Sequence, residues 1–538
     1  MNVPLTPVRF LRYAKEQYPD NTAVVCGDDR FTYTQFSERV SCLAGALRRQ
    51  GVQAGDRVAF LSPNCHRLLE AYYGVLEAGA VLLPLNVRLA PEELAYILNN
   101  SGATVLFLDQ VFVPLVDAFR NRVPMVKSFF LLNGAPRASW LAPENYEDLL
   151  AAASPYCADI MQFDENALAE LFYTSGTSAT PKGVMLTHRN VYLHAVNVIL
   201  AFTVGTKDAH LHTIPLFHAN GWGAAHFITL MGGKHVMIRS FEPAEVFRLV
   251  ARERVNSCFL VPIMASALVH SPERHEYELS SLKWIAIGGS ASSPTLVRDV
   301  KDKLGCECFS GYGLTETAPV LAISRERPGR VQWNGGGDSD ERLAMTGYPI
   351  PGVEIRVVDA NHRDVERDGQ TVGEIVTRCD GAMQGYWQQD EMTTDTLIGG
   401  WLHTGDMATI DAQGYVLIVD RKKDIIISGG ENISSLELEK TLMAHPSVYD
   451  AAVIPVPDEK WGEVPKAFVV VKPGEEAAEL ELLEFCRTRM AHYKAPHSVE
   501  FVLGLPKNAT GKTLKRELRR KHGADREVRN TLAAQTGA

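Results

Sequence analysis

Two patterns of hydrophobic positions take turns along the first half of the chain, one with helical spacing and one of short continuous apolar runs. Apolar side chains recur with helical spacing from Phe36 to Leu47, which predicts an amphipathic helix with one buried stripe. Short runs of consecutive apolar residues predict buried strands, and segments of helical spacing separate them. This alternation predicts an α/β fold of layered subdomains with mostly parallel strand pairing. The predicted strands are Val58–Leu61, Val81–Leu85 and Val105–Leu108.

Past residue 400 the pattern changes to a compact mixture of strands and helices. A strand predicted at Tyr415–Val419 leads directly into the charged segment Asp420–Asp424. We expect a domain boundary with a hinge at Asp420, because charged residues interrupt the apolar runs on both sides. The predicted domains are a large α/β domain over 1–419 and a small, mobile α+β domain over 420–538. In the small domain we expect helices at Ser434–His445 and around Leu482–Met490, and strands at Ala451–Val456 and Ala467–Val471.

The composition is that of an ordinary globular protein, with 46% hydrophobic and 22% charged residues. A chain of 538 residues exceeds what one hydrophobic core usually supports, in agreement with two domains. The formal net charge of −10 gives no support to nucleic acid or an anionic membrane as a partner. One basic segment, Lys512–Lys521, is interrupted by Glu517 and is interpreted as the solvated face of a helix.

Cysteine usage and the lack of targeting signals predict a cytoplasmic protein. The nine cysteines include no Cys-x-x-Cys pair, and Cys306 and Cys308 have neither redox nor zinc spacing, so we expect reduced thiols. The N-terminal residues lack the basic start and apolar stretch of a signal peptide. The apolar run Cys258–Val269 is shorter than the roughly 18 residues that cross a bilayer, so no transmembrane segment is expected.

The segment Tyr173–Val184, YTSGTSATPKGV, has the composition of a loop that surrounds a phosphate group. Such a loop needs glycines for close backbone approach, hydroxyl groups and a lysine. It departs from the Walker pattern of P-loop nucleotide hydrolases, because Lys182 follows a proline and has no glycine directly before it. For this segment alone, a surface loop rich in serine and threonine is the alternative.

Two glycine-rich segments follow later in the chain. Gly288–Ala291 comes directly after the predicted strand Trp284–Ile287, where small residues let a ligand approach the backbone. Gly311–Thr317, GYGLTET, departs from the dinucleotide-binding pattern because Glu316 stands where that pattern has its third glycine. Tyr312 could stack on a purine ring, and Glu316 could bind Mg²⁺, which uses one or two carboxylates together with phosphate oxygens. An ordinary turn is the alternative for each segment.

The loop at Tyr173–Val184 resembles the signature loop of the acyl-adenylate-forming superfamily, which includes acyl-CoA synthetases, beetle luciferases and the adenylation domains of peptide synthetases. The other motifs of that family follow in order up to Lys512, so the resemblance covers nearly the whole chain. It implies that ATP, Mg²⁺ and coenzyme A bind, with Glu316 and Thr177 at the metal. Ala179 departs from the glycine that the family usually has there. The residues implied to bind ATP or AMP are Thr174, Ser175, Gly176, Thr177, Ser178, Lys182, Gly288, Gly289, Ser290, Ala291, Gly311, Tyr312, Gly313, Thr315, Thr317, Asp406, Arg421 and Lys512.

The last motifs of the resemblance lie near and beyond the predicted hinge. Asp406, at the end of the segment WLHTGD, and Arg421 are implied to hold the ribose of the nucleotide. Lys512 is implied to reach the active site in one conformation only, where it binds the substrate carboxylate and the α-phosphate; a solvated loop lysine is the alternative. The residues implied to present coenzyme A for the second step are Ser428, Gly429, Gly430 and Glu431.

The segment Pro215–Trp222 corresponds to the family's segment beside the substrate carboxylate and the mouth of the acyl pocket. His218 is implied to flank the carboxylate, with a packed core histidine as the alternative. Trp222 resembles a gating indole of fatty acyl-CoA synthetases and would also suit a hydrophobic core. Because this segment has no Arg or Lys to pair a second anion, we expect an apolar monocarboxylic acid. The implied acyl-pocket residues are His218, Asn220, Gly221, Trp222, Gly289 and Gly313.

The resemblance implies an ATP-dependent acyl-CoA synthetase that works in two steps. A carboxylate first becomes an acyl-AMP, and the small domain then turns about Asp420 so that coenzyme A can take the acyl group. Short to medium fatty acids or thioether analogues are the first expectation, and an aryl or cinnamate-type acid is the second. A stand-alone enzyme that loads a carrier protein is a further alternative, and the family suggests a homodimer. The implied catalytic residues are Lys512, His218, Glu316 and Thr177.

Overall fold

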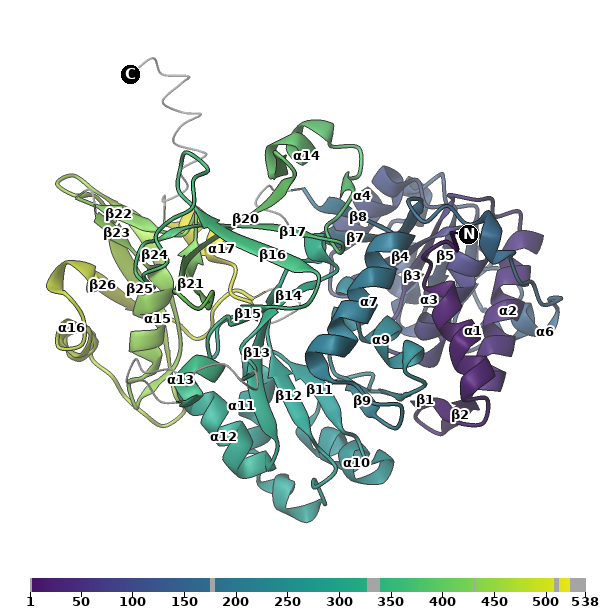
Figure 1. Cartoon of the computed structure of the whole chain (residues 1–538), viewed down its shortest axis with the longest axis horizontal. Helices are drawn as coiled ribbons and strands as arrows, with labels where there is room; N and C mark the ends of the chain where they lie inside the picture. Colours follow the sequence, from purple (N-terminus) through teal and green to yellow (C-terminus); the bar gives the residue numbers. More distant parts are fainter. Residues whose placement is uncertain (1, 175–179, 327–338, 430, 508–511, 523–538) are drawn as a thin grey trace. The chain divides into compact units, whose positions relative to one another are not determined.

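The computed structural model describes residues 2–174, 180–326, 339–429, 431–507 and 512–522 (Figure 1). Its strands and helices form an α/β protein, which confirms the predicted fold class. The chain divides into two compact units, which are Met1–Ile355 with Thr377–Leu402 and Arg356–Val376 with His403–Ala538. It passes from one unit to the other within three strands, β16 (Val353–Val358), β17 (Gly373–Cys379) and β20 (Trp401–Ile410). The hinge expected at Asp420 stays a prediction.

The first unit contains a seven-stranded sheet with the order β18-β8-β7-β4-β3-β5-β6. Pairing is parallel from β7 through β4, β3 and β5 to β6, and antiparallel between β7 and β8 and between β8 and β18. The three strands predicted in the first half of the sequence are β3, β4 and β5 of this sheet. The strands span Arg57–Leu61 (β3), Val81–Leu85 (β4), Val105–Leu108 (β5), Ser128–Leu131 (β6), Leu168–Thr174 (β7), Lys182–Thr187 (β8) and Gly385–Tyr386 (β18).

A nine-stranded sheet of the same unit has the order β15-β14-β13-β12-β11-β9-β10-β1-β2. Its central strands, from β13 to β1, all pair in parallel, so the carboxyl ends of β12 and β13 lie at one edge of the sheet. The strands span Thr22–Cys26 (β1), Asp29–Thr32 (β2), Ala209–His212 (β9), Lys234–Met237 (β10), Ser257–Leu260 (β11), Trp284–Ile287 (β12), Glu307–Gly313 (β13), Val320–Ile323 (β14) and Tyr348–Pro349 (β15).

Helix α2 (Tyr33–Arg49) illustrates how the sequence sets the helices around these sheets. The Thr32 hydroxyl accepts a hydrogen bond from Gln35 N at 3.3 Å, and the Gln35 side chain accepts one from Thr32 N at 2.9 Å, which forms a capping box. The apolar stripe from Phe36 to Leu47 is buried, as predicted. The other longer helices of this unit are α1 (Val8–Gln17), α3 (His66–Glu77), α4 (Pro91–Ser101), α7 (His188–Phe202), α9 (Ala224–Leu230), α10 (Pro243–Glu253), α11 (Pro262–His270), α12 (Pro294–Leu304) and α14 (Asp390–Thr396).

The second unit contains a sheet with the order β23-β22-β25-β24, to which β26 adds in parallel beside β25. Side chains from this sheet and two helices form a separate hydrophobic core around Ile426, Leu438, Val453 and Leu482. All four elements predicted beyond the hinge are present, although the second helix ends before Met490. The elements span Ile426–Ser428 (β22), Glu431–Ile433 (β23), Ser435–Met443 (α15), Val448–Asp458 (β24), Gly462–Val471 (β25), Glu479–Arg487 (α16), Ser498–Phe501 (β26) and Lys515–Lys521 (α17).

The basic segment Lys512–Lys521 corrects one expectation from the sequence. It forms α17, but this helix is not a solvated charged face throughout. Arg519 is 8% exposed and forms an ion pair with Asp424, and Lys515 Nζ lies 2.7 Å from Glu439 Oε1. A cation leaves water only where an anion receives it, and the carboxylates that pair with α17 come from distant parts of the sequence. Lys515 and Arg519 therefore anchor α17 inside this unit, while Arg520 and Lys521 are exposed.

Two further expectations can be compared with the structure. All nine cysteines lie in described segments and are free thiols, as predicted. Among the described residues, no helix combines the length and the apolar character that a bilayer crossing requires.

Candidate active site

The predicted ligand loops after β12 and β13 lie next to each other. Ile287, the last residue of β12, is opposite Ser310 in the parallel strand β13, so both loops leave the same edge of the sheet. A Cβ atom on Gly288 would lie 2.9 Å from the carbonyl oxygen of Gly311 and 3.0 Å from Cη2 of Trp222. No side chain fits there without displacing these neighbours. The short run Gly289–Ala291 that follows is exposed and open to a ligand.

The segment after Gly311 is fixed by contacts within its own turn. Tyr312 is half-buried on β13, opposite Ala322 of β14. A Cβ atom on Gly313 would lie 1.7 Å from the carbonyl oxygen of Pro319, so this position admits only glycine. The Thr317 hydroxyl donates to the carbonyl oxygens of Leu314 at 3.0 Å and Pro319 at 2.8 Å. Thr317 thereby holds the 3₁₀ turn η5 (Thr315–Thr317) that carries Glu316.

Glu316 and Lys182 both lie next to one tyrosine side chain, that of Tyr386. The Tyr386 hydroxyl donates to Glu316 Oε1 at 2.9 Å, and Lys182 Nζ lies 5.4 Å from the centre of the Tyr386 ring. Burial, and then the negative charge of Glu316, raise the pKa of Tyr386 above its ordinary value, so its hydroxyl remains a donor. The sequence motifs did not predict Tyr386, because it enters the site through the pairing of β18 with β8, some 200 positions earlier in the chain.

The predicted phosphate loop joins the two strands of a hairpin. Thr174 ends β7 and lies opposite Lys182, which begins β8. This pairing places the predicted phosphate lysine at the end of the hairpin where the loop begins. Glu316 is held nearby, because Met383, two residues before β18, donates from its backbone N to the Glu316 carbonyl oxygen at 2.8 Å. Four predicted residues of this loop lie outside the described part of the chain, namely Ser175, Gly176, Thr177 and Ser178.

The predicted acyl-pocket segment contains an unusual turn at Ala219–Trp222 (α8) and Gly223. All five residues have positive φ angles, from +43° at Ala219 to +88° at Gly223, which is a left-handed conformation. The Trp222 indole lies against Gly288 and Gly289, and its ring centre is 5.5 Å from that of Phe259 on β11. His218 is half-buried at the start of the turn, and its carbonyl oxygen accepts from Gly221 N at 3.2 Å. Trp222 therefore lies against the loop after β12.

The second unit brings together three residues predicted to bind the nucleotide. Asp406 on β20 lies opposite Arg421 on β21 (Val416–Arg421), and Arg421 Nε is 2.5 Å from Asp406 Oδ1. The half-buried Lys512 lies within electrostatic range of both. The positive charge of Arg421, followed by burial, lowers the pKa of Lys512 to about 8, while Asp406 acts in the opposite direction.

The predicted hinge residue Asp420 is a buried anchor of α15. Its Oδ2 accepts hydrogen bonds from Ser435 N at 2.6 Å and from the Ser435 hydroxyl at 2.7 Å. Lys515 Nζ donates to the same hydroxyl at 2.6 Å, so α17 is attached to this point as well. Burial raises the pKa of Asp420 above its ordinary value. The strand β21, the helix α15 and the helix α17 thus meet at one carboxylate.

The predicted coenzyme A segment forms the tight hairpin between β22 and β23. Ser428 pairs with Glu431, and Gly430 lies outside the described residues. Gly429 has φ +59°, and its N donates to the Trp461 carbonyl oxygen at 2.8 Å. A Cβ atom on Gly429 would lie 2.7 Å from Cε3 of Trp461. Trp461 is 43% exposed and was not predicted, because nothing in the local sequence links it to the hairpin.

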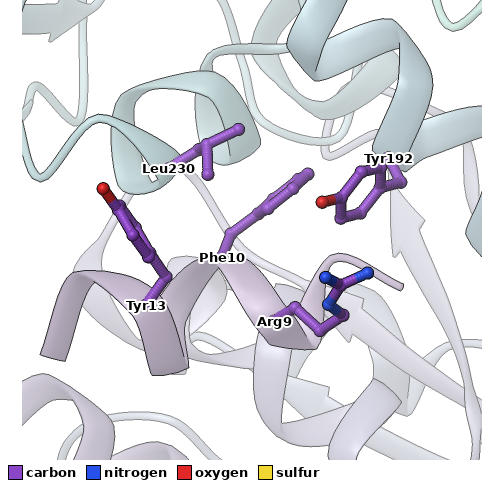
Figure 2. A pocket seen from close by; sticks show the side chains of 5 residues that line it. All are labelled: Arg9, Phe10, Tyr13, Tyr192 and Leu230. Atoms are coloured by element: carbon purple, nitrogen blue, oxygen red, sulfur yellow. The ribbon is translucent and has the colours of Figure 1, made fainter. Parts of the chain in front are cut away.

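A separate surface pocket of about 260 Å³ lies between α1, α7 and α9 of the first unit. Figure 2 shows that its lining contains none of the predicted site residues. The lining residues are Arg9, Phe10, Tyr13, Tyr192 and Leu230.

Comparisons with known proteins identify the family of the chain. Residues 11–387 match the family described as AMP-binding enzyme, and residues 437–512 match the AMP-binding enzyme C-terminal domain. A peroxisomal butyrate–CoA ligase of Arabidopsis thaliana is 36% identical over 537 residues, covering 96% of this chain and 93% of the relative. A long-chain-fatty-acid–CoA ligase of Thermus thermophilus is 38% identical, covering 92% of this chain and 90% of the relative.

Solved structures of other proteins have the same fold as this chain. A crystal structure of an anthranilate–CoA ligase in complex with anthranoyl-AMP superposes with a TM-score of 0.88 at 27% sequence identity, covering 97% of this chain and 98% of that chain. The family matches include residues of both units. The two relatives are named CoA ligases, and the alignments cover nearly their full length. The chain therefore belongs to the AMP-binding enzyme family, in its branch of acyl-adenylate-forming acid–CoA ligases.

Proposed function

We propose that this acid–CoA ligase acts on an apolar monocarboxylic acid, with a straight-chain fatty acid of short to medium length, or its thioether analogue, as the preferred substrate. The observation that carries the proposal is the packing of the Trp222 indole against Gly288 and Gly289 beside Phe259. This surface is apolar, and the segment Pro215–Trp222 has no Arg or Lys that could receive a second anion. A charged or zwitterionic acid would lose its hydration there without compensation.

An aryl acid is the second candidate. Flat apolar rings also pack on a glycine backbone beside aromatic side chains. The solved structure with anthranoyl-AMP belongs to a ligase for an aromatic acid, and it superposes with a TM-score of 0.88. The butyrate and long-chain-fatty-acid relatives, at 36% and 38% identity, favour the aliphatic acid.

In the first step, an oxygen of the substrate carboxylate attacks the α-phosphorus of ATP. The bond from that phosphorus to the bridging oxygen breaks, and pyrophosphate leaves with the electron pair. Lys182 would face the phosphates from the start of β8, and Asp406 and Arg421 would hold the ribose. Lys512 would direct its positive charge to the carboxylate and the α-phosphate, where negative charge accumulates in the transition state. His218 would flank the carboxylate.

The donors at Glu316 suit a magnesium ion. Mg²⁺ binds oxygen ligands and in nucleotide sites takes only one or two carboxylates, because phosphates and water supply the rest. Glu316 is half-buried, its backbone is fixed by the turn η5, and its carboxylate is oriented by the Tyr386 hydroxyl. Thr177 would be a second donor, and it lies outside the described residues. When bound, the ion would neutralise phosphate charge and orient the pyrophosphate leaving group.

In the second step, the thiol of coenzyme A loses its proton and attacks the acyl carbonyl carbon, and AMP leaves. We propose that the small domain turns about Asp420 between the steps, so that Lys512 withdraws and the hairpin at Gly429 faces the acyl-AMP. The anchoring of β21, α15 and α17 at Asp420 supports this proposal, because it lets the elements beyond the hinge turn together.

The proposal is tested by measuring pyrophosphate release with ATP across a panel of acids, with and without coenzyme A. We expect acid-dependent pyrophosphate release with aliphatic acids, and acyl-CoA only when coenzyme A is present. A higher kcat/KM for dicarboxylic or amino acids would contradict the substrate proposal. Faster transfer to a carrier protein than to free coenzyme A would favour the carrier-loading alternative.

We also propose that the enzyme works in a reducing compartment such as the cytoplasm, because its nine cysteines are free thiols. A homodimer is proposed from the family resemblance alone. Analytical ultracentrifugation of the purified chain distinguishes dimer from monomer.

A further inference from the structure

The left-handed turn at Ala219–Gly223 is an unfavourable conformation for L-amino acids. Three of its residues are not glycine, with φ +43° at Ala219, +47° at Asn220 and +59° at Trp222. A Cβ atom opposes each such angle, so a run of them persists only where the surrounding structure holds it. The turn therefore needs an explanation outside its own sequence.

Asn220 supplies the first part of that explanation. Its side chain is buried, with the residue 1% exposed. Its Oδ1 accepts from Gly223 N at 2.7 Å and closes the turn, while its Nδ2 donates to Glu170 Oε2 at 2.8 Å. The amide thus joins the end of the turn to the seven-stranded sheet, since Glu170 lies on β7.

Glu170 is completely buried and receives a second partner from α9. Its Oε1 accepts from His226 Nε2 at 2.6 Å. The rings of Tyr72 and Tyr73 contact His226 edge-on, at centre distances of 5.5 and 5.7 Å, and hold the imidazole in place. A carboxylate that is closed off from solvent cannot touch a substrate, so Glu170 has no direct part in the chemistry. We name Glu170, Asn220 and His226 the turn-holding network.

The network ends beside Trp222, the residue proposed to line the acyl pocket. Trp222 is the fourth residue of the turn, and its indole lies against Gly288, where an added Cβ would be 3.0 Å from Cη2. The indole extends far from the backbone. A small change in the backbone angles of the turn therefore displaces the far edge of the ring. The position of the ring thus depends on the hydrogen bonds of Asn220.

We propose that Glu170, Asn220 and His226 are positioning residues that set the chain-length selectivity of the enzyme by fixing where the Trp222 indole stands over Gly288 and Gly289. This inference rests on the proposed function. Apolar replacements of similar volume are often as stable as a buried network of polar side chains, so stability alone does not account for this one. Here it specifies one backbone conformation out of several that an apolar core would allow.

The test compares kcat/KM for decanoate and butanoate, measured by pyrophosphate release, in the wild type and in Asn220→Ala. We expect the decanoate-to-butanoate ratio to rise about tenfold, because the released indole no longer limits the pocket. The KM for ATP should stay within twofold. Trp222→Ala should raise the ratio similarly, and the double variant Asn220→Ala/Trp222→Ala should match Trp222→Ala alone. Proportional loss with both acids, or shifts that add in the double variant, would overturn the proposal.

Matched variants separate positioning from folding. His226→Leu removes the donor to Glu170 and should shift the ratio, while His226→Gln keeps a donor and should restore it. His188→Leu is the control, since His188 is also buried in this unit but bonds to the Thr6 hydroxyl at 3.0 Å. It should leave the ratio unchanged even if it lowers the melting temperature. Asn220→Gly, which accepts a positive φ, should still shift the ratio; an unchanged ratio would show that the amide is dispensable.

A second measurement distinguishes failure of the proposed function from failure of the positioning role. If the wild type releases no pyrophosphate with either acid, the substrate proposal fails, and the network is tested by acrylamide quenching of tryptophan fluorescence. Asn220→Ala should increase quenching relative to the wild type, and the increase should vanish in a Trp222→Phe background. Equal quenching in the wild type and Asn220→Ala would refute the positioning role.

Discussion

At the scale of single residues, Lys512, which is proposed to act in the first step, has a positive charge that its surroundings disfavour. Arg421 lies close enough to be the main cause of its lowered pKa, and burial adds to the effect. Asp406, which is ion-paired with Arg421, offsets only part of it. In the proposed function, an incoming α-phosphate and carboxylate would supply negative charge beside Lys512 and Arg421.

The first prediction concerns the two half-reactions. Lys512→Ala should lower acid-dependent pyrophosphate release by on the order of 100-fold or more, because one directed charge is lost from the transition state. Transfer of the acyl group from supplied acyl-AMP to coenzyme A should remain near the wild-type rate. Equal losses in both half-reactions would contradict this division of roles.

The second prediction concerns pH. Because the pKa of Lys512 is about 8, kcat/KM for ATP should fall as pH rises through about 8 instead of near the ordinary value of 10.5. Protein stability should change in the opposite direction, because the destabilisation by the charged Lys512 is lost as pH rises. The unfolded chain binds the proton more tightly, so Lys512→Met should raise the melting temperature at pH 7, and the gain should disappear between pH 8 and 10.5. A pH profile for ATP without an inflection near 8 would be inconsistent with this environment.

The third prediction concerns Tyr386. Tyr386→Phe removes the hydrogen bond to Glu316 Oε1 and should lower kcat/KM for ATP by about tenfold, since a hydrogen bond to a charged group contributes about 1.5–3 kcal/mol. The Mg²⁺ concentration for half-maximal rate should rise. Tyr33→Phe, which loses a buried hydrogen bond to the Gly233 carbonyl oxygen, should leave the Mg²⁺ dependence unchanged.

At the scale of elements, strands and helices were predicted more reliably than their side-chain partners. The strand at Val81–Leu85 was predicted with the bounds that the structure has, because a fully buried parallel strand is a continuous apolar run. The basic helix α17 was interpreted correctly at its exposed residues Arg520 and Lys521, but not at Lys515 and Arg519, whose partners Glu439 and Asp424 lie elsewhere in the sequence. Periodicity reports which face is apolar and carries no information about ion pairs across the fold.

The fourth prediction concerns the start of α15. Asp420→Ala removes the acceptor of Ser435 N and should lower the free energy of unfolding of the small unit by about 1–3 kcal/mol, since a buried donor is left without a partner. Amide hydrogen exchange in the first turn of α15 should become faster. Asp420→Asn keeps one carbonyl acceptor and should restore most of the protection; no change in Asp420→Ala would show that the contact is dispensable.

At the scale of the whole molecule, the residues proposed for the first step are divided between two compact units. Lys182, Glu316 and Trp222 belong to one, and Asp406, Arg421 and Lys512 belong to the other. The hairpin proposed for the second step also belongs to the second unit. An enzyme that uses one unit for two successive reactions has a reason to keep its domains separately folded.

The fifth prediction concerns a substitution that should impair only the second reaction, the transfer to coenzyme A. Gly429→Ala places a methyl group 2.7 Å from the Trp461 ring at a φ of +59°, and should slow transfer to coenzyme A by about tenfold while pyrophosphate release is unchanged. Gly474→Ala is a matched control, because Gly474 has φ +82° with open space around it. An equal effect of the two substitutions would show that backbone strain, and not the contact with Trp461, is responsible.

The sequence by itself determined the α/β class, the positions of the strands and helices that it predicted, and the order of the glycine-rich segments, because burial periodicity and short glycine-rich motifs are local properties of the chain. Only the tertiary structure decided that Tyr386 orients Glu316, that Asp406 pairs with Arg421, and that Glu170 holds the turn before Trp222. Each of these contacts joins segments that are distant in sequence, and their energies depend on burial and distance. Neither quantity exists until the chain has folded.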